Sequence, residues 1–277
     1  MNEIENRVAA HYGASGLLAR IDAGLRSLGL DPETITPDDL KPVDEFHIGG
    51  AKATDELLAQ VEIGPKTRVL DIGSGIGGAA RRVATRFGAH VTGVDLTPEF
   101  VETATALSNR AGLSGATEFR VGSATSLPVE DGAFDLALLL HVGMNIEDKA
   151  ALMREARRAL RPGGTFAVYE VMRAEDPSPL PFPMPWAERP DFSFVEPLET
   201  YLAAARAAGF EVVASRKRRE FAIAFFAAFR AALAEKGPPP LGLNLLMRET
   251  AGAKVANMLE SVTIGRIEPT ELILRAA

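Results

Sequence analysis

A glycine-rich turn flanked by two carboxylates is the feature of this sequence most suited to chemistry. Residues 67–78 read Thr-Arg-Val-Leu-Asp-Ile-Gly-Ser-Gly-Ile-Gly-Gly, an apolar run that enters a turn. Gly73, Gly75 and Gly78 let the chain turn tightly, present bare backbone to a ligand and pack a helix against a strand. Asp95 ends the next apolar run, about 20 residues beyond the turn, where a carboxylate can reach a ribose. Together these residues predict a nucleoside pocket.

The same turn also satisfies the G-x-G-x-x-G pattern of dinucleotide-binding enzymes. Asp71, two places before Gly73, argues against a dinucleotide, because it puts a negative charge beside the position that a diphosphate would occupy. S-adenosylmethionine offers an ammonium and a sulfonium in place of the phosphates. The stretch resembles motif I of the class I S-adenosylmethionine-dependent methyltransferases.

The resemblance extends along the chain in the order of the family's motifs. Residues 93–96 (Gly-Val-Asp-Leu) resemble its ribose-binding strand end, residues 134–140 its fourth strand, and residues 161–164 (Arg-Pro-Gly-Gly) the turn before its fifth. Four ordered motifs are more specific than one glycine loop. Residues 44–50 and 141–146 are further similar to small-molecule enzymes such as sarcosine and dimethylglycine methyltransferases.

This resemblance implies roles for individual residues around the cofactor and its product, S-adenosylhomocysteine. The backbone of the glycine turn would face the methionine end, and Asp95 would accept both ribose hydroxyls. Ser123 stands where the family often has an acidic residue near the adenine amino group, so the backbone of Ala124 is a second candidate for that contact. Asp71 either contacts the ammonium or only orders the loop. The expected cofactor contacts are Asp71, Gly73, Ser74, Gly75, Asp95, Leu96, Ser123, Ala124 and His141.

His141 is the candidate catalytic residue, because it follows the fourth strand at the edge where a transferred methyl would emerge. An ordinary histidine pKa near 6.5 lets it act as a base or a hydrogen-bond acceptor. A structural or cofactor-lining role stays open. Aromatic rings could surround an ammonium group by cation–π attraction or simply pack lids shut. The candidate substrate contacts are Tyr12, His47, Met144, Asn145 and Trp186. With four histidines and none at metal-ligand spacing, we expect no metal.

Alternating strand-like and helix-like segments must position these residues. The predicted strands are 68–72, 90–95, 117–121, 134–140, 165–171, 210–215 and 270–274, and helices separate the first five. We therefore predict an α/β fold: a Rossmann-like, doubly wound sheet, mostly parallel with an antiparallel C-terminal hairpin strand, plus helical lid segments.

The core is expected over residues 61–220 and 266–277, with three segments added to it. Residues 1–60 contain two or three helical stretches broken at Gly29, Pro32 and Pro37, and form an N-terminal helical lid. Residues 172–197, with many prolines around Trp186, form a lid loop or, alternatively, a motif for a proline-reading partner. Residues 221–265 form a helical insertion that acts as a cap, an interface or a cover for the sheet.

Composition narrows the partners. A net charge of −7 and a pI near 5.3 argue against nucleic-acid binding. The one basic cluster, residues 216–219, is interpreted as the solvated end of a strand. The sequence has no cysteine, no apolar signal core in residues 1–10 and no run long enough to span a membrane, so we expect a cytoplasmic protein without a membrane partner. A homo-oligomer is compatible with the sequence.

The leading hypothesis is methyl transfer from S-adenosylmethionine to an N, O or C atom of a small molecule. A protein that keeps the cofactor pocket without methylating, as a sensor, scaffold or cyclase, is the first alternative. A nicotinamide-dependent oxidoreductase is the second and is disfavoured by Asp71. The sequence does not identify the acceptor.

Overall fold

A seven-stranded sheet forms the centre of the computed structural model, which describes residues 3–13 and 16–277. The strand order is β3-β2-β1-β4-β5-β7-β6, and only β7 runs antiparallel to its neighbours. The strands are β1 (Arg68–Ile72), β2 (His90–Asp95), β3 (Thr117–Val121), β4 (Phe134–Leu140), β5 (Leu160–Arg173), β6 (Phe210–Lys217) and β7 (Ile267–Ala276). The predicted Rossmann-like fold with an antiparallel C-terminal strand is confirmed.

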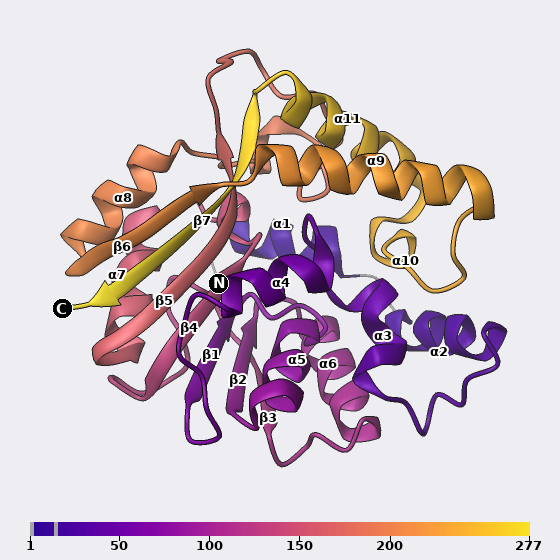
Figure 1. The fold of residues 1–277 in the computed structure, drawn as a ribbon, viewed down its shortest axis with the longest axis horizontal. Helices are drawn as coiled ribbons and strands as arrows, with labels where there is room; N and C mark the ends of the chain where they lie inside the picture. Colours follow the sequence, from indigo (N-terminus) through magenta and orange to yellow (C-terminus); the bar gives the residue numbers. More distant parts are fainter. Residues whose placement is uncertain (1–2, 14–15) are drawn as a thin grey trace.

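Helices cover both faces of the sheet (Figure 1). On one face, α4 (Gly50–Leu58) and α5 (Gly78–Phe87) pack apolar side chains against β1, β2 and β4. On the other, α7 (Lys149–Ala159) and α8 (Leu198–Ala207) pack against β4, β5 and β7. The inner strands are therefore buried from both sides, which explains why β1 and β4 read as nearly continuous apolar runs.

Local signals set the starts of the helices that follow β2 and β4. In α6 (Pro98–Arg110), Thr97 is the N-cap residue and Pro98 occupies the first turn, where its missing N–H costs nothing. In α7, the Asp148 carboxylate accepts a hydrogen bond from the backbone N–H of Ala151 at 2.8 Å. The helices begin at Pro98 and Lys149, shortly after β2 and β4 end, so the loops before them leave the sheet at its carboxyl edge.

The N-terminal region contains four helices in its described part, so the prediction of two or three is wrong. They are α1 (Glu3–Tyr12), α2 (Leu17–Ser27), α3 (Pro37–Asp44) and α4. Gly29 and Pro32 separate α2 from α3 as predicted, but Pro37 begins α3, with Thr36 as part of a capping box. Residues 1–2 and 14–15 of this predicted lid lie outside the described residues.

The two other added segments lie beyond the carboxyl ends of the strands. Residues 221–265 fall mainly in α9 (Arg219–Lys236), α10 (Asn244–Met247) and α11 (Ala251–Thr263). Figure 1 shows α9 and α11 side by side across the sheet end, with α1 beneath them in this view. The proline-rich loop after β5 contains one short 3-10 helix, η2 (Pro190–Phe192), and packs Met184 and Trp186 into the same cluster as Phe226 of α9.

The basic cluster at residues 216–219 is the predicted solvated strand end only in part: Arg216 and Lys217, at the end of β6, keep 47% and 56% of their side chains exposed, whereas Arg218 does not. Arg218 is buried, and its guanidinium pairs with Glu271 of β7 and with Glu56 of α4. The same guanidinium lies 4.0 Å from the centre of the Phe221 ring. Tertiary pairing therefore absorbs positive charge that the sequence alone assigns to solvent.

Candidate functional site

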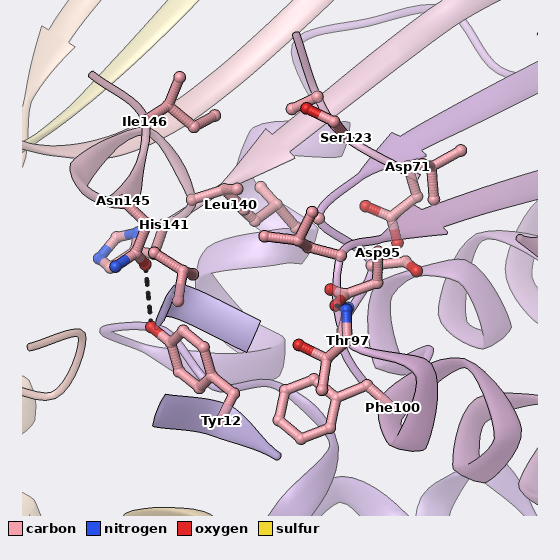
Figure 2. Close-up of a pocket in the computed structure, with 18 of the residues that line it drawn as sticks. Tyr12, Asp71, Asp95, Thr97, Phe100, Ser123, Leu140, His141, Asn145 and Ile146 are labelled. Atoms are coloured by element: carbon pink, nitrogen blue, oxygen red, sulfur yellow. Dashed lines mark hydrogen bonds between the residues drawn. The ribbon is translucent and has the colours of Figure 1, made fainter. Parts of the chain in front are cut away.

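A cavity of about 350 Å³ opens at the carboxyl ends of β1, β2 and β4. Figure 2 shows its labelled side chains, with Asp71 and Asp95 on one side and Tyr12, His141 and Asn145 on the other. Every predicted cofactor residue lines it: Asp71, Gly73, Ser74, Gly75, Asp95, Leu96, Ser123, Ala124 and His141. The structure thus brings the whole predicted set together, while their contacts with a ligand stay a prediction.

The glycine turn is held against β2 and exposes backbone to this cavity. The N–H groups of Gly73 and Ser74 both donate to the carbonyl of Val94, at 2.7 and 3.1 Å. Gly73 has φ 75°, and a methyl group there would overlap the side chain of Val142. Gly75 has φ 54° and faces open space. The turn therefore needs glycine for its conformation and for close approach.

Asp95 links the turn to the start of α6. One carboxylate oxygen accepts the N–H of Gly75 and the other that of Thr97, both at 2.8 Å. Burial raises the pKa of Asp95, and these backbone donors act in the opposite direction. Each oxygen retains a further lone pair, so the group is fixed in place and still able to accept hydrogen bonds from a ligand.

Asp71 is the most unusual polar group of the cavity. Its side chain is buried, and Oδ2 has no hydrogen-bond partner. Burial, followed by the charges of Asp95 and Glu45, raises its pKa to about 7. A cation beside Asp71 would supply the missing partner, whereas a diphosphate would add repulsion.

Ser123 contacts a residue that the sequence did not indicate. Its hydroxyl donates to the carboxylate of Glu5, and it lies 2.9 Å from the hydroxyl of Thr125. Glu5 belongs to α1, lines the same cavity and places an acid beside the position where the sequence has serine. No local signal points to Glu5, because α1 is a polar helix 118 residues away in the chain.

His141 lines the cavity in a conformation that few residues adopt. It has φ 55°, and its Nδ1–H donates to the carbonyl of Tyr169 at 3.0 Å. Nε2 is then the unprotonated nitrogen, and it is buried without a partner. Burial, with His47 as the second cause, lowers the pKa of His141 to about 3. The ring is therefore neutral near pH 7, and its Nε2 is suited to accept a hydrogen bond rather than to be protonated as a general base.

His47 is neutral for the same reason. Burial lowers its pKa to about 4. Its Nε2–H donates to the carbonyl of Gly50 at 3.2 Å, and Thr54, whose hydroxyl donates to Glu45, lies beside it. The rings of His47 and His141 are 5.8 Å apart between centres. Both predicted histidines therefore reach the site as uncharged groups.

A second cavity, of about 70 Å³, adjoins the first and shares the side chains of Tyr12, Phe46, His47 and His141 with it. Met144 and Trp186, two predicted substrate residues, line this second space. Asn145 lines the first, so the five predicted substrate residues Tyr12, His47, Met144, Asn145 and Trp186 are all distributed over the two adjoining cavities. Whether they bind substrate stays a prediction.

A chain of hydrogen bonds ties three distant segments over these cavities. The Tyr12 hydroxyl donates to Oδ1 of Asn145 at 3.0 Å, as drawn in Figure 2. The Asn145 amide then donates to the carbonyl of Trp186 at 2.9 Å. The Trp186 indole N–H donates to the hydroxyl of Ser193 at 2.8 Å. Helix α1, the short 3-10 helix η1 (Gly143–Asn145) and the proline-rich loop are thus joined.

Comparison with known proteins agrees with this geometry. Residues 70–168 match a family model described as a methyltransferase domain. This part of the chain is therefore a methyltransferase domain. The resemblance seen in the sequence is confirmed.

Relatives and solved structures extend the comparison. The chain is 33% identical over 135 residues to a sterol 24-C-methyltransferase of Neurospora crassa, covering 49% of this chain and 36% of that protein. It is 30% identical over 134 residues to a glycine/sarcosine/dimethylglycine N-methyltransferase of Actinopolyspora halophila, covering 48% of this chain and 24% of that one. The alignments thus span between a quarter and about a third of these curated relatives.

The geranyl diphosphate C-methyltransferase of Streptomyces coelicolor, solved with Mg²⁺, geranyl diphosphate and S-adenosyl-L-homocysteine, shares the fold. Its TM-score is 0.73 at 16% identity, over 100% of this chain and 98% of that one. The shared architecture therefore includes the segments outside the methyltransferase domain itself.

Glu170 is a further residue of the site that the sequence did not indicate. Its carboxylate, buried behind the cavity, accepts the N–H of Val142 and further backbone N–H groups of the η1 turn. Burial raises the pKa of Glu170 to about 7. Because Glu170 lies inside β5, where apolar residues surround it, only its oddity as a buried acid could have marked it.

Each helix in residues 3–13 and 16–277 is too short or too polar to cross a bilayer. Over that same part of the chain, no three histidine, aspartate or glutamate side chains gather as metal ligands would.

Proposed function

We propose that this protein transfers a methyl group from S-adenosylmethionine to an N, O or C atom of a small molecule. One observation carries the proposal: Asp71, a buried residue whose Oδ2 has no hydrogen-bond partner, lines a cavity that also presents the bare backbone of the glycine turn and the fixed carboxylate of Asp95. The matched methyltransferase domain contains all three features.

The residues present fit the cofactor. Asp71 would meet its ammonium, the glycine turn would lie along its methionine end, and Asp95 would accept its ribose hydroxyls. Glu5 and Ser123, joined to each other, would bound the base. When bound, S-adenosylmethionine supplies a methyl group activated by a sulfonium. In the free protein, Oδ2 of Asp71 is buried without a hydrogen-bond partner, which costs free energy. A ligand that brings an ammonium to this position would explain why the chain has a carboxylate there.

The chain's own part in the reaction is positioning and the exclusion of water. Holding two reactants in line can contribute roughly 7–11 kcal/mol of a barrier, so no catalytic triad is needed. Tyr12 and Phe46 stand where the two cavities join, and His141 offers a neutral nitrogen there. Glu170 holds the turn that carries Asn145. We assign His141 to hydrogen bonding of the acceptor rather than to proton storage.

Three segments are proposed to cover the site. The predicted lids at residues 1–60 and 172–197 are supported by the hydrogen bonds from Tyr12 to Asn145 and from Asn145 to Trp186. The predicted insertion at residues 221–265 is supported as a cap by Phe225, Phe226 and Phe229 of α9, which line the second cavity. The core at 61–220 and 266–277 carries the sheet.

A binding and turnover experiment tests the proposal. Calorimetric titration with S-adenosylhomocysteine and, separately, with NADH should give binding only for the first. Labelled S-adenosylmethionine with a panel of amines, phenols and carboxylates should then yield a methylated product. Tight binding of NADH alone would revive the oxidoreductase alternative, and tight cofactor binding with no product across the panel would favour a sensor, scaffold or cyclase.

The partner in this proposal is a small molecule, with neither nucleic acid nor membrane involved. The pairing of Arg218 with Glu271 and Glu56 supports the absence of nucleic-acid binding, because it neutralises a charge of the one basic cluster in the sequence. A cytoplasmic location belongs to the same proposal and rests on the cysteine-free sequence.

A further inference from the structure

The second cavity differs in chemistry from the first. The first cavity has several carboxylates and polar backbone groups among the apolar side chains of its lining, whereas aromatic, aliphatic and methionine side chains make up most of the lining of the second. Helix α9 contributes Phe225, Phe226 and Phe229, and α11 contributes Val255 and Met258. In the part of the chain that the structure describes, no lysine, arginine, aspartate or glutamate lines this second space.

Two imidazoles are the ionisable groups at the junction of the cavities besides Tyr12, and both are neutral. His47 already donates to Gly50, and the Tyr12 hydroxyl already donates to Asn145. At this junction, Nε2 of His141 is a polar atom that is buried without a partner. Because Nδ1–H is fixed on Tyr169, Nε2 presents a lone pair and needs a donor.

We propose, on the basis of the proposed function, that the acceptor is an uncharged, compact apolar molecule with one hydroxyl or amine hydrogen, which it donates to Nε2 of His141 while its apolar part fills the second cavity. The lining without charged side chains indicates that the acceptor is uncharged and apolar. The unpartnered Nε2 of His141 indicates that the acceptor donates a hydrogen bond. The cavity, of about 70 Å³, limits the apolar part to a ring or a short chain.

Charged acceptors are disfavoured by the balance of two effects. An ammonium could gain cation–π attraction from the phenylalanine rings. That gain is smaller than the cost of removing the ammonium from water without a carboxylate beside it. A carboxylate or phosphate would meet neither a lysine nor an arginine in the described lining, and the negatively polarised faces of the aromatic rings would repel it. Zwitterionic amines and phosphate esters therefore fit this space worse than neutral phenols or alcohols.

A matched series of probes tests the inference by binding alone. 4-Propylphenol, tyramine and 4-hydroxyphenylacetate share a phenol and differ in the charge of the tail, and 4-propylanisole lacks the hydroxyl hydrogen. Trp186 is the only tryptophan of the chain and lines the cavity, so its fluorescence reports occupancy. Titrations are run on the full protein saturated with S-adenosylhomocysteine.

We expect 4-propylphenol to bind at least tenfold more tightly than either charged probe and at least fivefold more tightly than 4-propylanisole. His141→Asn, chosen because asparagine tolerates a positive φ, should remove most of the preference for the phenol over the anisole. Val255→Asp should raise the affinity for tyramine at least tenfold. Leu233→Asp, at an exposed position of α9, is the control and should change neither the phenol preference nor the affinity for tyramine.

Equal or tighter binding of a charged probe by the unmodified protein would overturn the charge rule. An unchanged phenol preference in His141→Asn would overturn the role of Nε2. Failure of S-adenosylhomocysteine to bind in calorimetry would instead sink the proposed function, so the two failures are distinguishable.

Discussion

Asp71 should make cofactor binding depend on pH. In the free protein its pKa is about 7, so the group is mainly protonated at pH 6 and mainly ionised at pH 8. A ligand ammonium beside it favours the carboxylate and lowers the pKa in the complex. Binding therefore releases a proton whenever Asp71 begins protonated, and affinity must rise with pH.

The size of the effect follows from that pKa. If only the ionised form binds well, about one molecule in eleven is competent at pH 6 and about ten in eleven at pH 8. The affinity for S-adenosylhomocysteine should rise about tenfold between these values. The stability of the ligand-free protein should change in the opposite direction. Because folding raises the pKa of Asp71 from 3.8 to about 7, this group stabilises the fold fully below pH 3.8, and that stabilisation is lost as the pH rises through about 7.

Isothermal calorimetry in two buffers of different ionisation enthalpy measures both the affinity and the protons released. Asp71→Asn should bind about tenfold to a hundredfold more weakly at pH 8, as expected for loss of a charge-assisted hydrogen bond, and should release no proton through this site. Asp95 and Glu45 act on Asp71 by their charges, and the pKa values of Asp44 and Glu170 are raised to about 6 and about 7, so any slope left in the variant is assigned to these other carboxyls. Glu118→Gln, on the exposed edge of β3, is the control. An affinity that is flat from pH 6 to pH 8 in the unmodified protein would refute the reasoning.

Three further changes test the frame around the site. Gly73→Ala should abolish cofactor binding and lower the melting temperature, because the new methyl group would overlap Val142, whereas Gly163→Ala, at a similar φ of 76° with open space around it, should cost only backbone strain and keep binding. Arg81→Met breaks a buried ion pair with Asp44 and should destabilise the fold by about 3–5 kcal/mol in denaturant unfolding. Tyr12→Phe removes one hydrogen bond between α1 and the η1 turn and should cost about 0.5–1.5 kcal/mol, seen as a raised KM with the fold intact.

Each of these has a result that would count against it. Equal binding by the two glycine variants would show that overlap with Val142 does not matter. An Arg81→Met protein as stable as the parent would mean that Asp44 is neutralised in another way, consistent with its own raised pKa of about 6. A Tyr12→Phe enzyme with the KM of the unmodified protein would show that the hydrogen bond from α1 to Asn145 does not contribute to acceptor binding.

The sequence predicts the centre of the fold because the centre is encoded locally. The first four strands have the predicted bounds. The inner strands β1 and β4 are nearly continuous apolar runs that are buried from both sides, whereas β3 is a largely exposed edge strand that keeps its place in the alternation of strands and helices. The glycine turn, Asp71 and Asp95 could be located for the same reason, because their spacing is fixed by one crossover between adjacent parallel strands.

Features that depend on long-range pairing could not be predicted in the same way. Strand β5 begins at Leu160, which pairs with Phe134, so it starts five residues before the predicted range 165–171 and includes residues 161–164, which were predicted as a turn. It continues to Arg173, two residues past the prediction, because β7 pairs with it along Thr165–Arg173. The contact of Ser123 with Glu5 joins residues 118 apart, and no periodicity encodes it. The burial of Arg218 likewise depends on carboxylates supplied by other elements.

Helix α1 carries both Glu5 and Tyr12, and these two side chains reach opposite parts of the site, at Ser123 and at Asn145. One helix therefore makes a hydrogen bond at each of the two parts of the site. Lifting it would loosen the nucleoside end and the acceptor end in the same movement, so departure of the two products should share a single gate and a single rate constant.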